Sequence, residues 1–486
     1  MAEHLSPLDA MFLEFEQADE SAHMHIGAVS VFDPVPGGRN PTLADLCERL
    51  EQRLASLPRF RQRLSSARTG GMFWPTWEPD PNFDVRDHVR QATLPAPGGE
   101  VELLDWIADF YSHRLDRSRP LWETVLLDGL ADGRWALASK THHCLNDGVS
   151  SVDLGYVVLD AEPSPQRLEQ AAPAPPLQVE DGLSTPGLLL RGARAGLSAA
   201  THPRGVLART RAVVEMLTGD ELVAPATSLN QPIGGTRRYA AVRVPLEGLQ
   251  AIKRELGGTI NDVVLALSAG GLRRLLLSRG ETLPVEGLRG QIPVNIRSAS
   301  EQLALGNRLV SLFVHLPVAE RDPLRRYQLV LSEARHRKHG TQALGAKTLI
   351  DITSLAPPAV HAALARSLFD VRLFNLTITN VPASPKSLYA FGARLREVLP
   401  LVPLLARHAV GIAAVSYAGE MVFGINADRA TVPDLDVLAD GIHQSFAELQ
   451  ALAARMHIWN RRPAGRRSPR RPDPLTPSAD MRRPEL

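Results

Sequence analysis

Apolar residues recur along the chain at two spacings, and each spacing predicts a different kind of element. Near the N-terminus, Leu8, Met11, Phe12 and Phe15 stand at helical intervals, which predicts a helix. Residues 25–32 form a short apolar run rich in β-branched side chains, which is typical of a buried strand. The chain therefore opens with a helix and a strand.

A second helix is predicted after Thr42. Thr42 and Asp45 have the spacing of a capping box, in which each side chain accepts a hydrogen bond from the other residue's backbone. Apolar residues then repeat at helical spacing, at Leu43, Leu46, Leu50, Leu54 and Leu57. This helix thus has a marked start and one apolar face.

Two strand-like runs, residues 121–127 and 135–141, are separated by two Asp-Gly pairs, which predicts an antiparallel pair of strands. The second run leads into a polar segment that ends at Ser150, and residues 149–159 have the apolar spacing of a helix. Polar side chains therefore lie where a buried strand gives way to a helix.

This segment holds two adjacent histidines, His142 and His143, followed by Asp147 and Gly148. A neutral imidazole is the side chain best suited to accept a proton near neutral pH. Neighbouring residues of an extended segment point to opposite faces, so only one histidine can face a given cavity. If His143 does so, His142 points into the domain. The residue types equally allow two core or surface histidines beside an ordinary Asp-Gly turn.

Changes in composition divide the chain into four parts. The predicted parts are a first domain at 1–161, a Pro/Ala-rich linker at 162–235, a second domain at 236–458 and a disordered Arg/Pro-rich tail at 459–486. Within the second domain, the pattern predicts strands at 238–244, 290–295, 310–316 and 375–382, a hairpin within 415–425, and helices at 263–276 and 434–452.

The linker contains two predicted helices, residues 188–200 and 204–217, that are basic and amphipathic. This pattern is typical of helices that lie on an anionic membrane surface. It is equally typical of helices packed across two domains, so both interpretations stay open.

Composition and charge exclude several classes of protein. The net charge is +1, but eight Arg and three acids lie from Trp459 onward, which leaves 46 basic against 50 acidic residues in the rest. The tail has no interleaved aromatic residues, so we expect no nucleic-acid partner. Two cysteines, Cys47 and Cys144, make neither a disulfide framework nor a Cys-rich zinc site. With no signal peptide and no transmembrane run, we expect a cytoplasmic protein.

Several short motifs occur in a characteristic order along the chain. The spacing His-His-x-x-x-Asp-Gly at residues 142–148 matches the signature of CoA-dependent acyltransferases. The other motifs are Leu5-Ser6-Pro7-Leu8-Asp9, Pro120-Leu121-Trp122-Glu123, Asn261-Asp262-Val263-Val264, Pro293-Val294-Asn295-Ile296-Arg297, Gly306-Asn307 and Thr379-Asn380-Val381-Pro382. Together they cover almost everything up to residue 458, and in this order they resemble the bacterial wax ester synthase/diacylglycerol acyltransferase family.

The resemblance implies an α/β fold of two chloramphenicol-acetyltransferase-like domains, with an active-site tunnel at their interface. It implies that His143 is the general base and that His142, Asp147 and Gly148 give the motif its architecture. It also implies that Arg61 pairs with Asp147, because an unpaired buried carboxylate costs several kcal/mol. Arg61 is otherwise explained as part of a basic exposed turn.

Two further pairs of site residues follow from the resemblance. Asn261 and Asp262 would line the substrate site, and the ordinary alternative is that Thr259 or Asn261 only caps a helix. Thr379 and Asn380 would face the oxyanion of the reaction or line the substrate site, and one donor to the oxyanion contributes roughly 10²–10³ in rate. Related enzymes commonly carry a serine at the position of Thr379, and a threonine within a sheet is the ordinary alternative.

The implied function is transfer of a long-chain acyl group from acyl-CoA, a co-substrate, to diacylglycerol or a fatty alcohol. No metal and no bound cofactor are expected, and oligomeric state is not readable from the sequence. We expect peripheral association with the inner membrane face or lipid inclusions. Two alternatives stay open, namely an acyltransferase of the same fold with another acceptor or a carrier-protein donor, and a non-enzymatic lipid-binding protein.

Overall fold

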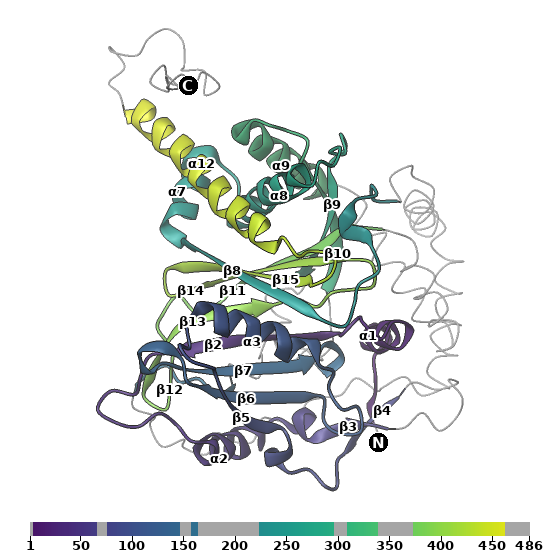
Figure 1. Cartoon of the computed structure of the whole chain (residues 1–486), viewed down its shortest axis with the longest axis vertical. Helices are drawn as coiled ribbons and strands as arrows, with labels where there is room; N and C mark the ends of the chain where they lie inside the picture. The colour runs from purple at the N-terminus through teal and green to yellow at the C-terminus, as the bar shows by residue number, and fades with distance from the viewer. Residues whose placement is uncertain are drawn as a thin grey trace, which may run out of the picture.

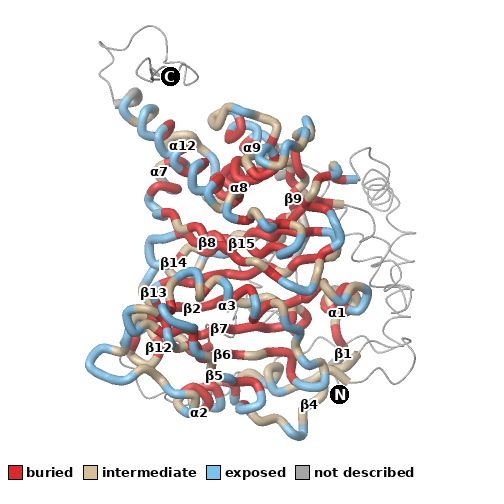
Figure 2. Tube along the Cα trace, viewed as in Figure 1, coloured by how far each residue is buried: buried red, intermediate tan, exposed pale blue. Residues whose placement is uncertain are grey.

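The computed structural model of the protein describes residues 3–65, 75–145, 157–163, 223–295, 309–338 and 373–461. Two six-stranded sheets dominate this part of the chain, one above the other (Figure 1). The buried residues follow the strands of both sheets and the helix α8 (Figure 2). The predicted mixture of helices and strands is therefore confirmed.

The first sheet carries the histidine motif. Its strands, in spatial order, are β12 (Tyr389–Ala390), β13 (Ala393–Leu401), β2 (His25–Phe32), β7 (Trp135–His142), β6 (Trp122–Asp128) and β5 (Val89–Thr93). The predicted antiparallel pairing of β6 with β7 is confirmed. Every residue of β7 is buried, since helices or the second sheet cover both faces.

The second sheet is built mainly from the C-terminal half. Its strands, in spatial order, are β10 (Leu309–Leu316), β9 (Leu288–Asn295), β11 (Leu376–Pro382), β14 (Val410–Tyr417), β15 (Glu420–Asp428) and β8 (Arg237–Pro245). Strand β11 runs parallel to both β9 and β14. A small third sheet has the order β1 (Glu3–His4), β4 (Thr76–Pro79) and β3 (Gln62–Leu64).

Helices cover the sheets on separate faces. They are α1 (Pro7–Ala18), α2 (Leu43–Leu54), α3 (Glu100–Ser112), α7 (Leu246–Leu256), α8 (Ile260–Ser278), α9 (Pro323–Lys338) and α12 (Leu435–Arg461). Short 3₁₀ turns lie at η1 (Pro58–Arg61), η2 (Val85–Asp87), η3 (Ala131–Gly133), η4 (His143–Leu145) and η5 (Ser228–Asn230). Helices α7, α8, α9 and α12 gather on the second sheet, whereas α1 lies at one end of the region between the two sheets (Figure 1).

Local patterns predicted many of these elements closely. The capping box of Thr42 and Asp45 is present at the start of α2. Helix α12 ends at Arg461, nine residues later than the predicted end at 452, and so includes the first residues of the predicted tail. No helix among the described residues is long and apolar enough to cross a membrane. The two predicted linker helices and nearly all of the predicted tail lie outside the described residues.

One connection does not follow the predicted order of domains. Strands β12 and β13 belong by sequence to the second predicted domain, yet β13 pairs antiparallel with β2 of the first sheet. The chain therefore crosses from one half to the other and back. This crossing ties the two sheets together beside the histidine-bearing strand β7. The domain boundaries themselves remain a prediction.

Candidate functional site

The histidine motif begins where β7 ends. His142 is the last residue of β7, and His143 is the first residue of η4. The backbone N–H of His142 donates to the carbonyl of Leu121 on one side, over 2.9 Å. The N–H of His143 donates to the carbonyl of Met24 on the other side, over 2.8 Å. Two neighbouring segments thus fix the backbone that carries both imidazoles.

His142 points into the protein and is 1% exposed. Its Nδ1 accepts a hydrogen bond from the backbone N–H of Cys144 over 3.2 Å, so the proton of the neutral ring lies on Nε2. That nitrogen lies 3.6 Å from Oε2 of Glu16. Burial lowers the pKa of His142, which keeps the ring neutral. His142 therefore serves the structure of the turn.

His143 is half-buried and stacks against a phenylalanine ring. The ring centroids of His143 and Phe12 lie 3.9 Å apart, at an interplanar angle of 19°. Burial lowers the pKa of His143 to about 4, although a hydrogen bond to its own carbonyl acts in the opposite direction. The imidazole is thus neutral at pH 7 and carries a lone pair that can accept a proton.

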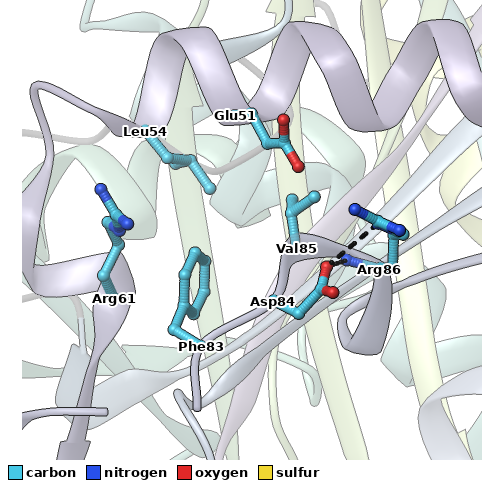
Figure 3. A pocket seen from close by; sticks show the side chains of 7 residues that line it. All are labelled: Glu51, Leu54, Arg61, Phe83, Asp84, Val85 and Arg86. Carbon is cyan, nitrogen blue, oxygen red and sulfur yellow. Dashed lines mark hydrogen bonds and ion pairs between the residues drawn. The ribbon is translucent and has the colours of Figure 1, made fainter. Parts of the chain in front are cut away.

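Asp147 and Gly148 lie outside the described residues, so the structure does not test their roles. Arg61 is exposed, and its guanidinium lies 5.2 Å from the centre of the Phe83 ring. It stands at the edge of a surface pocket of ≈ 350 Å³ that includes Asp84 but neither histidine of the motif (Figure 3). Arg61 therefore faces solvent. An arginine partner is expected for a buried carboxylate, and a carboxylate exposed to solvent does not need one.

Arg59, two residues before Arg61 in η1, lies over a different aromatic ring. Its guanidinium lies 4.6 Å from the centre of the Trp77 ring, and Trp77 is 2% exposed. Burial raises the pKa of the Cys144 thiol well above its usual range, and the charge of Arg59 acts against this rise. Of the two arginines, Arg59 is thus the one whose charge reaches the histidine motif.

Asn261 and Asp262 lie in the first turn of α8. The carboxylate of Asp262 accepts hydrogen bonds from the backbone N–H of Thr259 over 2.7 Å and from its hydroxyl over 2.8 Å. The Thr259 hydroxyl in turn accepts from the backbone N–H of Asp262 over 3.2 Å, which completes a capping box. The predicted helix cap is thus Thr259, with Asp262 as its partner in the capping box, whereas Asn261 is half-buried in the same turn.

Thr379 and Asn380 lie in β11, opposite Ala413 and Ala414 of β14. Both side chains are half-buried. On the other side of β11, the pairing with β9 covers only Leu376 and Thr377, although both strands continue beyond it. Within the described residues, the pairing of β11 with β9 therefore ends at Thr377, two residues before Thr379.

Sequence reasoning missed a cluster of charged residues behind His142. Glu16 of α1 is 2% exposed and contacts His25 as well as His142. Its carboxylate accepts a hydrogen bond from Nε of Arg117 over 2.9 Å. The helical spacing of Phe12 and Glu16 put them on one face of the predicted helix, but only the fold brings that face to the motif.

The described residues give little support to a metal site or to a thiol nucleophile. Within them, no group of three or more His, Cys, Asp or Glu side chains is arranged to hold a metal ion. Cys144 is fully buried, and burial raises the pKa of its thiol well above the usual range, which disfavours the thiolate. At neutral pH, the described part of this segment thus presents neutral imidazoles and a protonated thiol.

Two family models match the chain. The model described as the wax ester synthase/diacylglycerol acyltransferase catalytic domain matches residues 5–264, and the model of the C-terminal domain matches residues 305–450. A putative diacylglycerol O-acyltransferase of Mycobacterium bovis is 34% identical over 466 residues, which is 95% of this chain and 98% of the relative. A probable diacylglycerol O-acyltransferase of Mycobacterium tuberculosis, tgs2, is 33% identical over 92% of this chain and 98% of its own length.

Solved structures show the same fold. A wax ester synthase/diacylglycerol acyltransferase from Marinobacter aquaeolei VT8 superposes with a TM-score of 0.66 at 27% identity, over 93% of this chain and 100% of the other. The starter condensation domain of rhizomide synthetase superposes with a TM-score of 0.56 at 15% identity, over 93% and 94% of the two chains. These likenesses confirm the predicted fold class.

Proposed function

Because the chain belongs to the wax ester synthase/diacylglycerol acyltransferase family and is therefore an acyltransferase, we propose that His143 is its general base. The observation that carries this proposal is a neutral imidazole held at the end of a fully buried strand. General-base assistance by such a group typically contributes about 10²–10⁴-fold in rate.

The reaction proceeds by direct transfer between two bound substrates. Nε2 of His143 takes the proton of the acceptor hydroxyl as its oxygen attacks the thioester carbonyl of acyl-CoA. The tetrahedral intermediate then collapses, the carbon–sulfur bond breaks, and the imidazolium returns its proton to the CoA thiolate. No acyl-enzyme forms, and no metal or bound cofactor takes part.

The oxyanion of that intermediate needs donors on the opposite side of the carbonyl. The hydroxyl of Thr379 fills this role, since β11 is half-buried there. Neighbouring side chains of a strand point to opposite faces, so Asn380 lines the site away from the oxyanion. Asn261 lines the substrate site from the first turn of α8. Asp262 lies at the same site, and its main contribution is to fix that turn through the capping box with Thr259.

The turn after His143 completes the motif. The ring of His142 fixes the start of this turn by accepting the Cys144 N–H, and Asp147 and Gly148 give the rest of the turn its shape. The partner of the Asp147 carboxylate comes from η1, and Arg59 suits this role better than Arg61, because Arg61 faces solvent over Phe83.

The donor is a long-chain acyl-CoA and the acceptor is diacylglycerol, which gives triacylglycerol. This assignment follows the names of relatives that match over nearly the whole chain. Fatty alcohols are second acceptors and give wax esters, in line with the description of the family model. Because these acceptors partition into lipid, the protein works from the cytoplasm as a peripheral protein at a membrane or lipid inclusion.

The proposal is tested with labelled palmitoyl-CoA and either dioleoylglycerol or hexadecanol, and the lipid products are separated by thin-layer chromatography. We expect triacylglycerol from the wild type and at least a 10²-fold loss in His143→Ala. His443→Ala, at an exposed position of α12, is the matched control and should keep full activity.

Two outcomes would contradict the proposal. Equal amounts of product from the wild type and from His143→Ala would show that His143 is not the general base. No product from either acceptor, with both proteins folded by circular dichroism, would favour a carrier-protein donor, another acceptor or a purely lipid-binding role.

A further inference from the structure

One face of α1 lies against the histidine motif. Phe12 stacks on the imidazole of His143. Glu16, one helical turn later on the same face, contacts Nε2 of His142. Asp9 lies three residues before Phe12, is fully buried, and its charge contributes to the raised pKa of the Cys144 thiol. Three consecutive residues of the motif therefore each interact with this one helix face.

Glu16 is the charged member of this face. Its carboxylate is held by Arg117, whose Nε donates to Oε2 over 2.9 Å and whose terminal nitrogen donates to the same oxygen. Burial alone would raise the pKa of Glu16, but the neighbouring His142, His25 and Arg117 hold it well below its usual range. The group is thus a permanent carboxylate that faces the Nε2–H of His142.

This contact reaches His143 through His142. With its Nε2–H facing Glu16, the His142 ring turns Nδ1 toward the residue that follows His143, where it accepts the Cys144 N–H. The same Nδ1 lies 2.9 Å from the Cys144 sulfur. Residues on both sides of His143 are therefore fixed by one ring, and the orientation of that ring depends on the carboxylate.

We propose that Glu16 is a positioning residue for the acyl transfer, which orients the His143 imidazole by fixing the ring of His142 while Phe12 holds the imidazole face. This inference rests on the proposed role of His143. Misplacement of a reacting group by about 1 Å can cost roughly 10²-fold in rate. Removal of the carboxylate charge should therefore impair turnover without weakening the binding of acyl-CoA.

The test compares Glu16→Gln with Glu20→Gln, an exposed control just beyond the end of α1. For Glu16→Gln we expect kcat to fall by about 10–100-fold, with KM for palmitoyl-CoA within about twofold of the wild-type value. The control should match the wild type in both constants. A kcat within about twofold of wild type, or a raised KM at unchanged kcat, would overturn the inference.

A second readout does not depend on activity. With histidine labelled at ¹³Cε1, the His143 signal is identified by its loss in His143→Ala, and we expect it to shift or split in Glu16→Gln. An unchanged signal would overturn the inference even if the protein acts on other substrates. If Glu16→Gln does not fold, Phe12→Leu removes the ring stack and keeps an apolar side chain. The same shift and the same fall in kcat are then expected, and their absence would count equally against the inference.

Discussion

At the scale of single residues, burial is the main cause that sets the protonation state of His143, the proposed general base. His143 lies beside Phe12 and the neutral His142, and within the described residues no acidic side chain contributes to its pKa. Burial therefore lowers its pKa, whereas a carboxylate partner would have raised it. The imidazole is a weaker base in consequence, but it is almost wholly in the reactive neutral form at pH 7.

The pH dependence of kcat/KM tests this environment. A histidine of ordinary pKa, about 6.5, would lose about three quarters of its neutral form at pH 6. Because the pKa of His143 is lowered to about 4, we expect kcat/KM to change by less than about twofold between pH 8 and pH 6. A steady-state profile in buffers of constant ionic strength measures this. An acidic limb centred near pH 6.5 would contradict the inferred environment of His143.

At the scale of elements, the sequence predicted those whose signals are local. Helix α2 carries its capping box and its leucine face within one short stretch, and β2 has the predicted bounds. The pairing of β13 with β2 was not predictable in the same way, because it joins residues more than three hundred positions apart. The contact of Glu16 with His142 is of the same kind, since the helical pattern of α1 does not say which face meets the motif.

Two capping boxes that begin with threonine offer a matched test at this scale. Thr259→Ala in α8 and Thr42→Ala in α2 remove the same interaction, and each should lower the free energy of unfolding by about 0.5–2 kcal/mol. Only α8 carries Asn261 beside its cap. We therefore expect Thr259→Ala to lose activity several-fold and Thr42→Ala to keep it.

Denaturant midpoints and acyltransfer rates of both variants, measured together, separate the two effects. Equal activity in both variants would make the start of α8 a purely structural feature and would remove Asn261 from the proposed site.

At the scale of the whole molecule, folding removes several histidines from solvent. Burial lowers the pKa of each of them: His23, His25, His88, His142, His143 and His408. For His23, His143 and His408 the pKa falls to about 4. These histidines can be recognised as a group only in the folded chain, because the sequence does not distinguish a buried histidine from an exposed one.

These histidines give stability a predictable dependence on pH. The unfolded chain takes up protons below about pH 6.5, whereas the folded chain does so only near pH 4. Stability should therefore be full above pH 6.5 and decline as the pH falls from 6.5 toward 4, before most carboxylates titrate. Each histidine contributes at most about 1.4 kcal/mol per pH unit in this window.

Denaturant midpoints at intervals between pH 8 and pH 5 measure this decline. His408 is the most informative single position, because its pKa is lowered to about 4 and it is far from the acyl-transfer motif in sequence. Its two ring nitrogens lie 2.6 Å and 3.0 Å from the carbonyls of Ala406 and Phe374. His408→Gln keeps a polar side chain that does not titrate. It should therefore reduce the fall in midpoint between pH 7 and pH 5, whatever it does to stability at pH 7. His443→Ala, at an exposed site, should leave the fall unchanged. A midpoint independent of pH down to 5 in the wild type would mean that the buried imidazoles take up protons as readily in the folded chain as in the unfolded one.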